Sequence, residues 1–472
     1  MVALITRLPA ELLTEIFLWL QASYVEHYPE EILKWILVTH VSKRWRLIAF
    51  NSKELWTTIP THQTAYAQLA SRLSSPLLVS ITDEHFMPSS QPSEETLGTF
   101  ASLFPRARKI QAMSEIGSHF ARALENTPLE FPRLQDLEID EVAMHLTDIS
   151  PFPNTLKCLR LSHSSFEWNW FDKLDRLTEL HLCHNTSNGI TVESFVDYMS
   201  QIPNLSHLEI RGLFYVSDED SDTSSSHEDA ATITLRHLTV WDSLGLVADL
   251  LSFIEFTEDF TFHGELGVDE ETPDTIEAFF QEIERHLQAS QWVIRRASLL
   301  VNHKDFLTLS CFDQDGSTPF LFIEGQEIPD ETKEALLDGM QTISFGTVQR
   351  LLTDAFTDMA KWKDCCFRSL ESLQELDIRN HESTDAFLRF LVSDADAARQ
   401  SNDWNSISFP ALKKVTFRGV QHHRHIEWIK SMAGVVFTVR ALHGFEVEEF
   451  ALYCGNTMDD GLHHLPDWLI TE

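Results

Sequence analysis

The chain has 472 residues, of which 43% are hydrophobic, and it includes 12 tryptophans and 32 phenylalanines, so it can bury a sizeable core. Its formal net charge is -36, and residues 1–60 add nothing to that excess because their acidic and basic side chains balance. A surface this negative repels nucleic acid and anionic lipid, so we expect neither as a partner; it either favours a basic protein partner or only confers solubility.

The sequence indicates a protein of the cytoplasm, the nucleus or both. Its 6 cysteines lie mostly at apolar positions without a Cys-x-x-Cys pair, which is typical of reduced thiols. Arg7, Glu11 and Glu15 interrupt the first residues, which excludes the apolar core of a signal peptide. No apolar run reaches the roughly 18 residues that crossing a membrane requires.

Two short amphipathic helices are predicted near the N-terminus, over residues 8–20 and 35–49. The first carries an apolar stripe of residues four apart, widened by two neighbours: Leu8, Leu12, Ile16, Leu20, Leu13 and Phe17. In the second, apolar residues recur at steps of three and four: Val38, Val41, Trp45 and Ile48. A unit this small is near the lower limit for burying its own core, so we expect its apolar residues to need a partner.

Three segments here follow one another in a recognisable order. They are Leu-Pro-x-Glu-Leu-Leu-x-Glu-Ile-Phe from residue 8, Val-Thr-His-Val-Ser-x-x-Trp-Arg-x-Ile-Ala from residue 38 and Leu-Trp-Thr-x-Ile from residue 55. They resemble an F-box, and more narrowly the F-box of mushroom-forming fungi, although Ser42 stands where that family often has cysteine.

The resemblance implies a three-helix unit that docks a Skp-type adaptor, which tethers it to a cullin ubiquitin ligase. The adaptor contacts that it implies in this chain are Leu8, Pro9, Leu12, Ile16, Val41 and Trp45. The alternative is an ordinary helical hairpin packed on the rest of the chain, with Trp45 and Trp56 as its core.

After a predicted helix at 62–75 and a predicted strand at 76–82, an apolar residue is repeatedly followed three and five positions later by two more. The full copies are Leu134, Leu137, Ile139; Leu156, Leu159, Leu161; Leu177, Leu180, Leu182; Leu205, Leu208, Ile210; Leu235, Leu238, Val240; Leu373, Leu376, Ile378; and Leu412, Val415, Phe417. Weaker copies begin at Ala107, Thr257, Met340 and Val447. Successive starts from Leu134 lie 22, 21, 28 and 30 residues apart, a spacing like that of leucine-rich repeats loosened by insertions.

Helices are predicted between these strands, at 192–201, 244–256, 275–288, 347–362, 385–399 and 426–433. Alternation of strand and helix predicts an α/β fold, in which a short three-helix F-box unit (1–60) precedes an irregular leucine-rich-repeat-like solenoid (61–472) with a parallel sheet. The competing interpretation is a generic α/β sheet. Residues 217–229 contain no apolar residue and are predicted to be a mobile acidic loop.

The sequence offers no catalytic constellation. It lacks the Gly-rich phosphate-binding loops, the Gly-x-Ser-x-Gly nucleophile motif and the His-Glu-x-x-His zinc motif. Histidines cluster at His422, His423, His425, His463 and His464, but no cysteine or carboxylate lies at a ligand-like local spacing, so a surface cluster is favoured over zinc. We therefore predict no catalytic residue, no metal site and no cofactor.

With the F-box resemblance, these features predict a substrate-recognition subunit of a Skp-cullin-F-box ubiquitin ligase. Residues 1–60 would bind the adaptor, and the repeats would bind an unidentified target protein. The predicted target contacts are the polar residues between the repeat's apolar positions, on the concave face: Glu138, Arg160, His181, Glu209, Thr239, Asp377 and Thr416. The alternatives are an interaction scaffold outside any ligase, or an enzyme with an unrecognised site in the solenoid.

Overall fold

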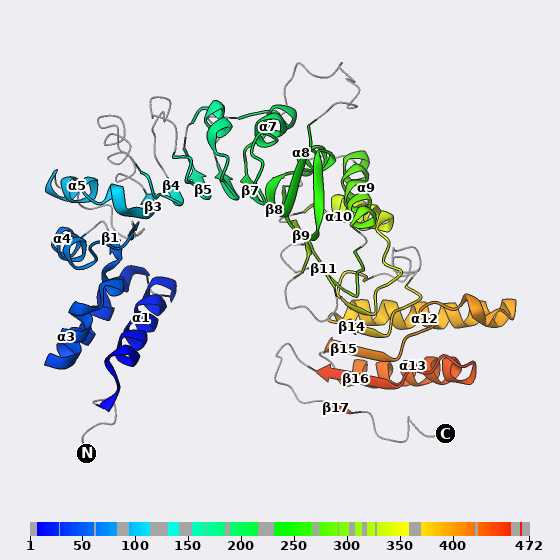
Figure 1. The fold of residues 1–472 in the computed structure, drawn as a ribbon. Coiled ribbons are helices and arrows are strands. Elements are labelled where there is room, and N and C mark those ends of the chain that lie inside the picture. The colour runs from blue at the N-terminus through cyan, green and yellow to red at the C-terminus, as the bar shows by residue number, and fades with distance from the viewer. Residues whose placement is uncertain are drawn as a thin grey trace. The chain divides into compact units, whose positions relative to one another are not determined.

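The computed structural model describes residues 7–27, 29–60, 63–82, 94–113, 131–140, 153–164, 166–184, 189–215, 231–267, 273–290, 292–301, 307–313, 319–325, 328–357, 370–420, 423–454 and 463–464. The chain forms two compact units, Met1–Ser226 and His227–Glu472 (Figure 1). Within the described ranges, no helix is both long enough and apolar enough to cross a membrane.

The first unit begins with short helices. α1 (Ala10–His27) is followed by the 3₁₀ helix η2 (Pro29–Leu37), α2 (Val38–Val41), α3 (Lys43–Asn51) and the 3₁₀ helix η3 (Lys53–Trp56). The prediction of one continuous helix over 35–49 is therefore wrong, because Ser42 is extended, with φ -159° and ψ 163°. The Ser42 hydroxyl accepts a hydrogen bond from the Trp45 amide at 3.1 Å, so this serine starts a new helix as its N-cap.

These N-terminal helices share a small aromatic core. Trp35 and Trp56 are buried, and their rings meet edge to face with centroids 5.3 Å apart. The Trp56 indole donates to the Ala49 carbonyl at 2.8 Å, and its ring also contacts Tyr66 of α4 (Thr64–Leu73) at 5.8 Å. The N-terminal helices are therefore packed against the segment that follows them.

The first unit continues as a parallel sheet whose strands pair in chain order. They are β1 (Thr58–Pro60), β2 (Val79–Thr82), β3 (Ala107–Met113), β4 (Asp136–Asp140), β5 (Cys158–Ser162), β6 (Glu179–Cys183) and β7 (His207–Arg211). The helices along these strands are α4, α5 (Glu94–Ala101), η4 (Phe104–Arg106), η6 (Trp168–Lys173) and α7 (Val192–Met199).

The second unit has a mixed sheet. In order of pairing, its strands are β8 (Ile233–Ser243), β9 (Ile254–Gly267), β12 (Leu321–Gly325), β11 (Leu307–Phe312), β10 (Arg296–Val301), β13 (Arg350–Thr353), β14 (Glu375–Ile378), β15 (Lys414–Val420), β16 (Glu449–Cys454) and β17 (His463–His464). The strands β10, β11 and β12 form an antiparallel meander, and β17 is antiparallel to β16. The parallel sheet that the sequence predicted for the solenoid is therefore interrupted by the meander, and it resumes where β13 pairs beside β10.

Helices separate most of the strands of the second unit. They are α8 (Leu244–Ser252), α9 (Pro273–Ala289), α10 (Asp330–Gly339), η9 (Met340–Thr342), α12 (His381–Ser401), η11 (Trp404–Ser406) and α13 (His423–Leu442). The long helices α12 and α13 lie side by side next to the last parallel strands (Figure 1).

Every residue of the full repeat copies is buried, from Leu134 in the first unit to Phe417 in the second. The predicted fold class, N-terminal helices followed by a leucine-rich-repeat-like α/β solenoid, is confirmed. Two local predictions are wrong: the helix expected at 347–362 contains β13, and the weak copy at Met340 forms η9 and no strand. Pairing on both sides, with β10 and β14, overrides the helical pattern at β13.

Two predictions are left open. The acidic loop predicted at 217–229 lies outside the described residues. The domain boundary predicted at residue 60 marks a change of sequence pattern, whereas the division between the two compact units falls at residue 226, within the repeats.

Gly419 occupies a bulge of β15 that other residues fit poorly. Its φ is +78°, and a Cβ there would lie 2.6 Å from the Arg379 carbonyl oxygen. We expect Gly419→Ala to lower the free energy of unfolding by about 1–3 kcal/mol, because it adds a clash to a left-handed backbone. Urea unfolding measures this, with Gly98→Ala in α5 as the control, since a Cβ at Gly98 meets nothing within 4 Å. Equal stability of the two variants would contradict the bulge geometry.

Candidate functional site

Large apolar side chains that remain exposed gather on the N-terminal helices. Those residues, which we call the apolar patch, are Leu12, Ile16, Trp19, Leu20, Leu37, Val41, Leu47 and Phe50. Trp19 is 76% exposed and Val41 is 62% exposed. In the rest of the described residues, exposed large apolar side chains are scattered, for example at Tyr215 and Trp241. A concentration of exposed apolar side chains marks a surface that binds a partner.

The patch exists because α1 is apolar on two sides. Leu13 and Phe17 form a fully buried inner row, and the Phe17 ring lies 5.2 Å from that of Trp45 in α3. The inner row ends at Gln21, whose Nε2 donates to the buried Leu55 carbonyl at 3.0 Å. Since these contacts fix the rotation of α1 about its axis, the outer row of Leu12, Ile16 and Leu20 is left facing solvent.

Polar contacts join α1 and α3 to the residues at the end of the other helix. The Arg44 guanidinium donates to the Leu8 carbonyl, and the hydroxyls of Thr14 and Ser52 lie 2.9 Å apart. The patch is therefore a defined surface on packed helices.

The predicted adaptor contacts fall into two groups. Leu12, Ile16 and Val41 belong to the apolar patch, and Pro9 is exposed beside them. Leu8 and Trp45 are half-buried, and the Trp45 ring packs on Phe17, so Trp45 supports the unit as well as lining its surface. An adaptor-binding role for all six residues stays a prediction.

Sequence reasoning missed Trp19 and Leu37 as contacts, although both side chains are well exposed. Trp19 follows Ile16 by three positions, and Leu37 precedes Val41 by four. These are the steps of neighbouring side chains on one helix face, so the same periodicity that singled out Leu12 and Ile16 could have found them.

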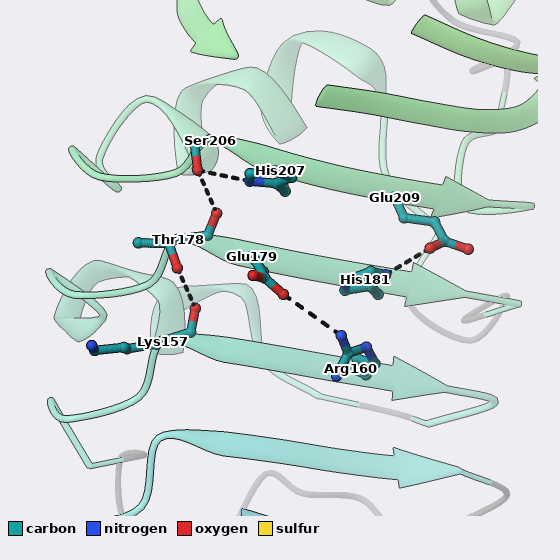
Figure 2. Close-up of polar contacts among 8 residues, drawn as sticks. All are labelled: Lys157, Arg160, Thr178, Glu179, His181, Ser206, His207 and Glu209. Atoms are coloured by element: carbon teal, nitrogen blue, oxygen red, sulfur yellow. Dashed lines mark hydrogen bonds and ion pairs between the residues drawn. The ribbon is translucent and has the colours of Figure 1, made fainter. Parts of the chain in front are cut away.

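A second candidate surface lies on the polar side of the first unit's sheet. The strands β3 to β7 bring into one row the residues Gln111, Glu138, Arg160, His181 and Glu209, which we call the polar ladder. Figure 2 shows its last three residues, where His181 Nδ1 lies 2.6 Å from Glu209 Oε2 and Arg160 Nη2 lies 3.6 Å from Glu179 Oε2. Cross-strand pairs of this kind stabilise the sheet and also present alternating charge to a partner.

Glu209 is the most strongly perturbed acid of the ladder. The hydrogen bond with His181 is the main cause that lowers the pKa of Glu209 from 4.5 to about 2, and Arg211, whose Nε donates to Oε1 at 2.8 Å, adds to it; partial burial acts in the opposite direction. An ionised carboxylate only accepts hydrogen bonds, so Nδ1 of His181 must carry the shared hydrogen.

The remaining predicted target contacts lie in the second unit. Asp377 accepts hydrogen bonds from Arg418 Nε to both carboxylate oxygens, each at 2.9 Å. Thr416, its neighbour in register, is 5% exposed, and Thr239 is 8% exposed. A protein docked on this sheet would therefore touch the neighbours of these threonines more than the threonines themselves. Of the predicted contacts, the structure assembles Glu138, Arg160, His181 and Glu209 into one row.

One group of side chains in the first unit has the composition of a metal site. The donor atoms of Cys158, Glu179 and His181 all lie within 4.8 Å of one another. Sequence reasoning considered ligands that are close along the chain, and it missed this group because its members lie on two neighbouring strands. Burial raises the pKa of Cys158 to about 12, which is the opposite of what an activated nucleophile requires.

Comparison with known proteins identifies the N-terminal segment. Residues 5–60 match the family model described as F-box-like. The chain therefore carries an F-box-like domain at its N-terminus, and a leucine-rich-repeat-like α/β solenoid follows it. No curated protein matches the chain.

Two solved structures with low sequence identity are similar to the chain. The leucine-rich repeat-containing protein LegL7 from Legionella pneumophila is 12% identical with a TM-score of 0.28, and the match covers 81% of this chain and 94% of LegL7. The TLR13–ssRNA13 complex is 12% identical with a TM-score of 0.29, and the match covers 70% of this chain and 45% of that one. At these values the likenesses add nothing to the fold assignment, which rests on the strand register described above.

The ladder leads to a prediction about acid stability. Because the folded pKa of Glu209 lies below its ordinary value, the stability it contributes is fully present above about pH 4.5 and is lost as the pH falls toward 2. We expect Glu209→Gln to lower the free energy of unfolding by about 1–3 kcal/mol at pH 7, and by less at pH 3. Urea unfolding at both pH values measures this, with Glu138→Gln as the control. A deficit of Glu209→Gln that is the same at both pH values would contradict the prediction.

Proposed function

We propose that this protein is the substrate-recognition subunit of a Skp-cullin-F-box ubiquitin ligase. The observation that carries the proposal is the apolar patch, which lies within the segment that matches the F-box-like model. In this proposal the patch binds a Skp-type adaptor, the adaptor binds a cullin, and the protein itself performs no catalysis. In this proposal the protein acts in the cytoplasm, the nucleus or both. Its F-box is of the type found in mushroom-forming fungi.

The energetics of the patch support docking to a protein partner. Burying one Leu or Ile side chain stabilises a complex by about 1.5–3 kcal/mol, and association costs about 4–15 kcal/mol in lost freedom of motion. Several anchors must therefore act together, and the patch presents Leu12, Ile16, Trp19 and Val41 on packed helices. The buried inner row keeps these anchors in place before binding, which lowers the entropy that docking loses.

The solenoid would hold the target. The polar ladder offers Glu138, Arg160, His181 and Glu209 as target contacts, and Asp377 offers a carboxylate in the second unit. The net charge of -36 favours a target with a basic surface. Ubiquitin transfer would then follow from proximity, because the adaptor and cullin bring the held target to the charged conjugating enzyme.

Docking is tested with charge placed inside the apolar patch. We expect the double variant Leu12→Asp, Val41→Asp to lose co-elution with the Skp-type adaptor in size-exclusion chromatography after co-expression, since both side chains are exposed and the changes leave the helix core intact. The matched control is Val435→Asp, Leu442→Asp on α13, which places the same two substitutions at exposed sites of the second unit.

The wild type and the control should co-elute with the adaptor. Co-elution of the patch variant would show that these are not the contacts, and failure of the wild type to bind would refute the F-box function. Cullin that co-purifies with the wild type, together with faster turnover of a bound protein, supports the ligase role. Adaptor binding without a cullin would instead mean a scaffold outside any ligase.

A further inference from the structure

We infer that Cys158, Glu179 and His181 form a zinc site on the polar side of β5 and β6. The inference goes beyond the proposed function and does not depend on adaptor docking. It rests on the convergence of a thiol, a carboxylate and an imidazole, whose donor atoms lie within 4.8 Å of one another.

The backbone already places the three donors on one face. Cys158 on β5 is paired in register with Glu179 on β6. His181 follows Glu179 by two positions on the same strand, and side chains two apart along a strand point to the same side of the sheet. The three side chains therefore converge without any change of the main chain.

The remaining adjustment is small. Zinc bonds of about 2.0–2.3 Å set tetrahedral ligand atoms about 3.3–3.8 Å apart, so donors that lie within 4.8 Å of one another need to approach by at most about 1.5 Å. Cys158 is buried, whereas the side chain of Glu179 is 41% exposed and that of His181 is 22% exposed. A change of rotamer at Glu179 can bring its carboxylate to the ion, while Cys158 and the His181 ring, which Glu209 holds, stay in place.

His181 has the carboxylate partner that zinc-binding histidines commonly have. Its Nδ1 donates to Glu209, whose other carboxylate oxygen accepts a hydrogen bond from Arg211, so Nε2 is the ring nitrogen left to bind an ion. Histidines that bind zinc commonly donate their other ring hydrogen to a carboxylate in this way, and that carboxylate fixes the tautomer and the ring direction. Glu209 would have this supporting role and would not itself bind the ion.

The donor set favours zinc over the hard cations. Calcium and magnesium prefer oxygen ligands, whereas a thiolate with an imidazole and a carboxylate suits Zn²⁺. On binding, the proton of the Cys158 thiol passes to solvent, and the sulfur bonds to the ion as a thiolate. Three protein donors leave a fourth position that water fills.

The positive charge of Arg160 disfavours zinc binding, so a substitution of Arg160 tests the proposed site. Its guanidinium lies 3.6 Å from the Glu179 carboxylate, so in the absence of zinc it neutralises a proposed ligand. Its side chain is 35% exposed and can turn toward solvent when the ion enters. We therefore expect Arg160→Gln to tighten zinc binding several-fold, which a purely structural role for the cluster does not predict.

The test uses Co²⁺ as a spectroscopic probe on the full chain, purified without a histidine tag. We expect the wild type to show a thiolate-to-cobalt charge-transfer band that one equivalent of Zn²⁺ removes. Cys158→Ser should abolish the band, and Cys183→Ser, the same substitution on neighbouring β6, should retain it. Absence of the band in the wild type, or its persistence in Cys158→Ser, would overturn the site.

Two further variants guard against a folding defect in Cys158→Ser, and circular dichroism checks the fold of each. Glu209→Gln should weaken Zn²⁺ binding about 10- to 100-fold by freeing the His181 ring. His181→Gln, a change at a partly exposed side chain, should also weaken it. Unchanged affinity in both variants would refute the proposed ligand arrangement whatever Cys158→Ser does.

Discussion

The structure depends on the burial of one face of its strands. In the first unit, Leu137, Leu159, Leu180 and Leu208 stand in register on consecutive strands, and all four are buried. Side chains alternate along a strand, so this apolar row forces the residues between its members onto the opposite face. The polar ladder is the direct result. Its charges sit close together because the leucines beneath them are stacked, and the same stacking brings a cysteine, a carboxylate and a histidine within reach of one ion.

The N-terminal helices are limited by how much apolar surface so small a unit can bury. They are too few to enclose all of their apolar side chains, and α1 carries two apolar rows where a small unit can bury only one. Phe17 and the tryptophans Trp35 and Trp56 fill the core, so Leu12 and Ile16 remain outside. An exposed apolar surface that is held in place by a packed core beneath it is suited to binding a stable protein partner. Charge follows the same division, since residues 1–60 are neutral overall and the acidity lies in the rest of the chain.

The sequence predicted the features that depend on the spacing of residues close together along the chain. The three-and-five pattern located the buried strand residues correctly, because alternation along a strand appears directly in the order of residues. It could not report pairing between distant segments, so the strand β13 and the parallel pairings of β13 with β10 and of β12 with β9 were missed. The break at Ser42 was missed because a serine inside an apolar periodicity looks like a tolerated helix residue until its hydroxyl is seen to cap Trp45. The group of Cys158, Glu179 and His181 could not be predicted either, because it forms only when the neighbouring strands β5 and β6 pair.

Hydrogen–deuterium exchange of the full chain, with and without a Skp-type adaptor, shows whether the apolar patch is the adaptor-docking surface. We expect slower exchange of backbone amides in α1 and in residues 37–50 on adaptor binding, with no change in β4 to β7. Protection of the solenoid strands with unchanged exchange in α1 would contradict this expectation, because the adaptor would then be bound by the repeats.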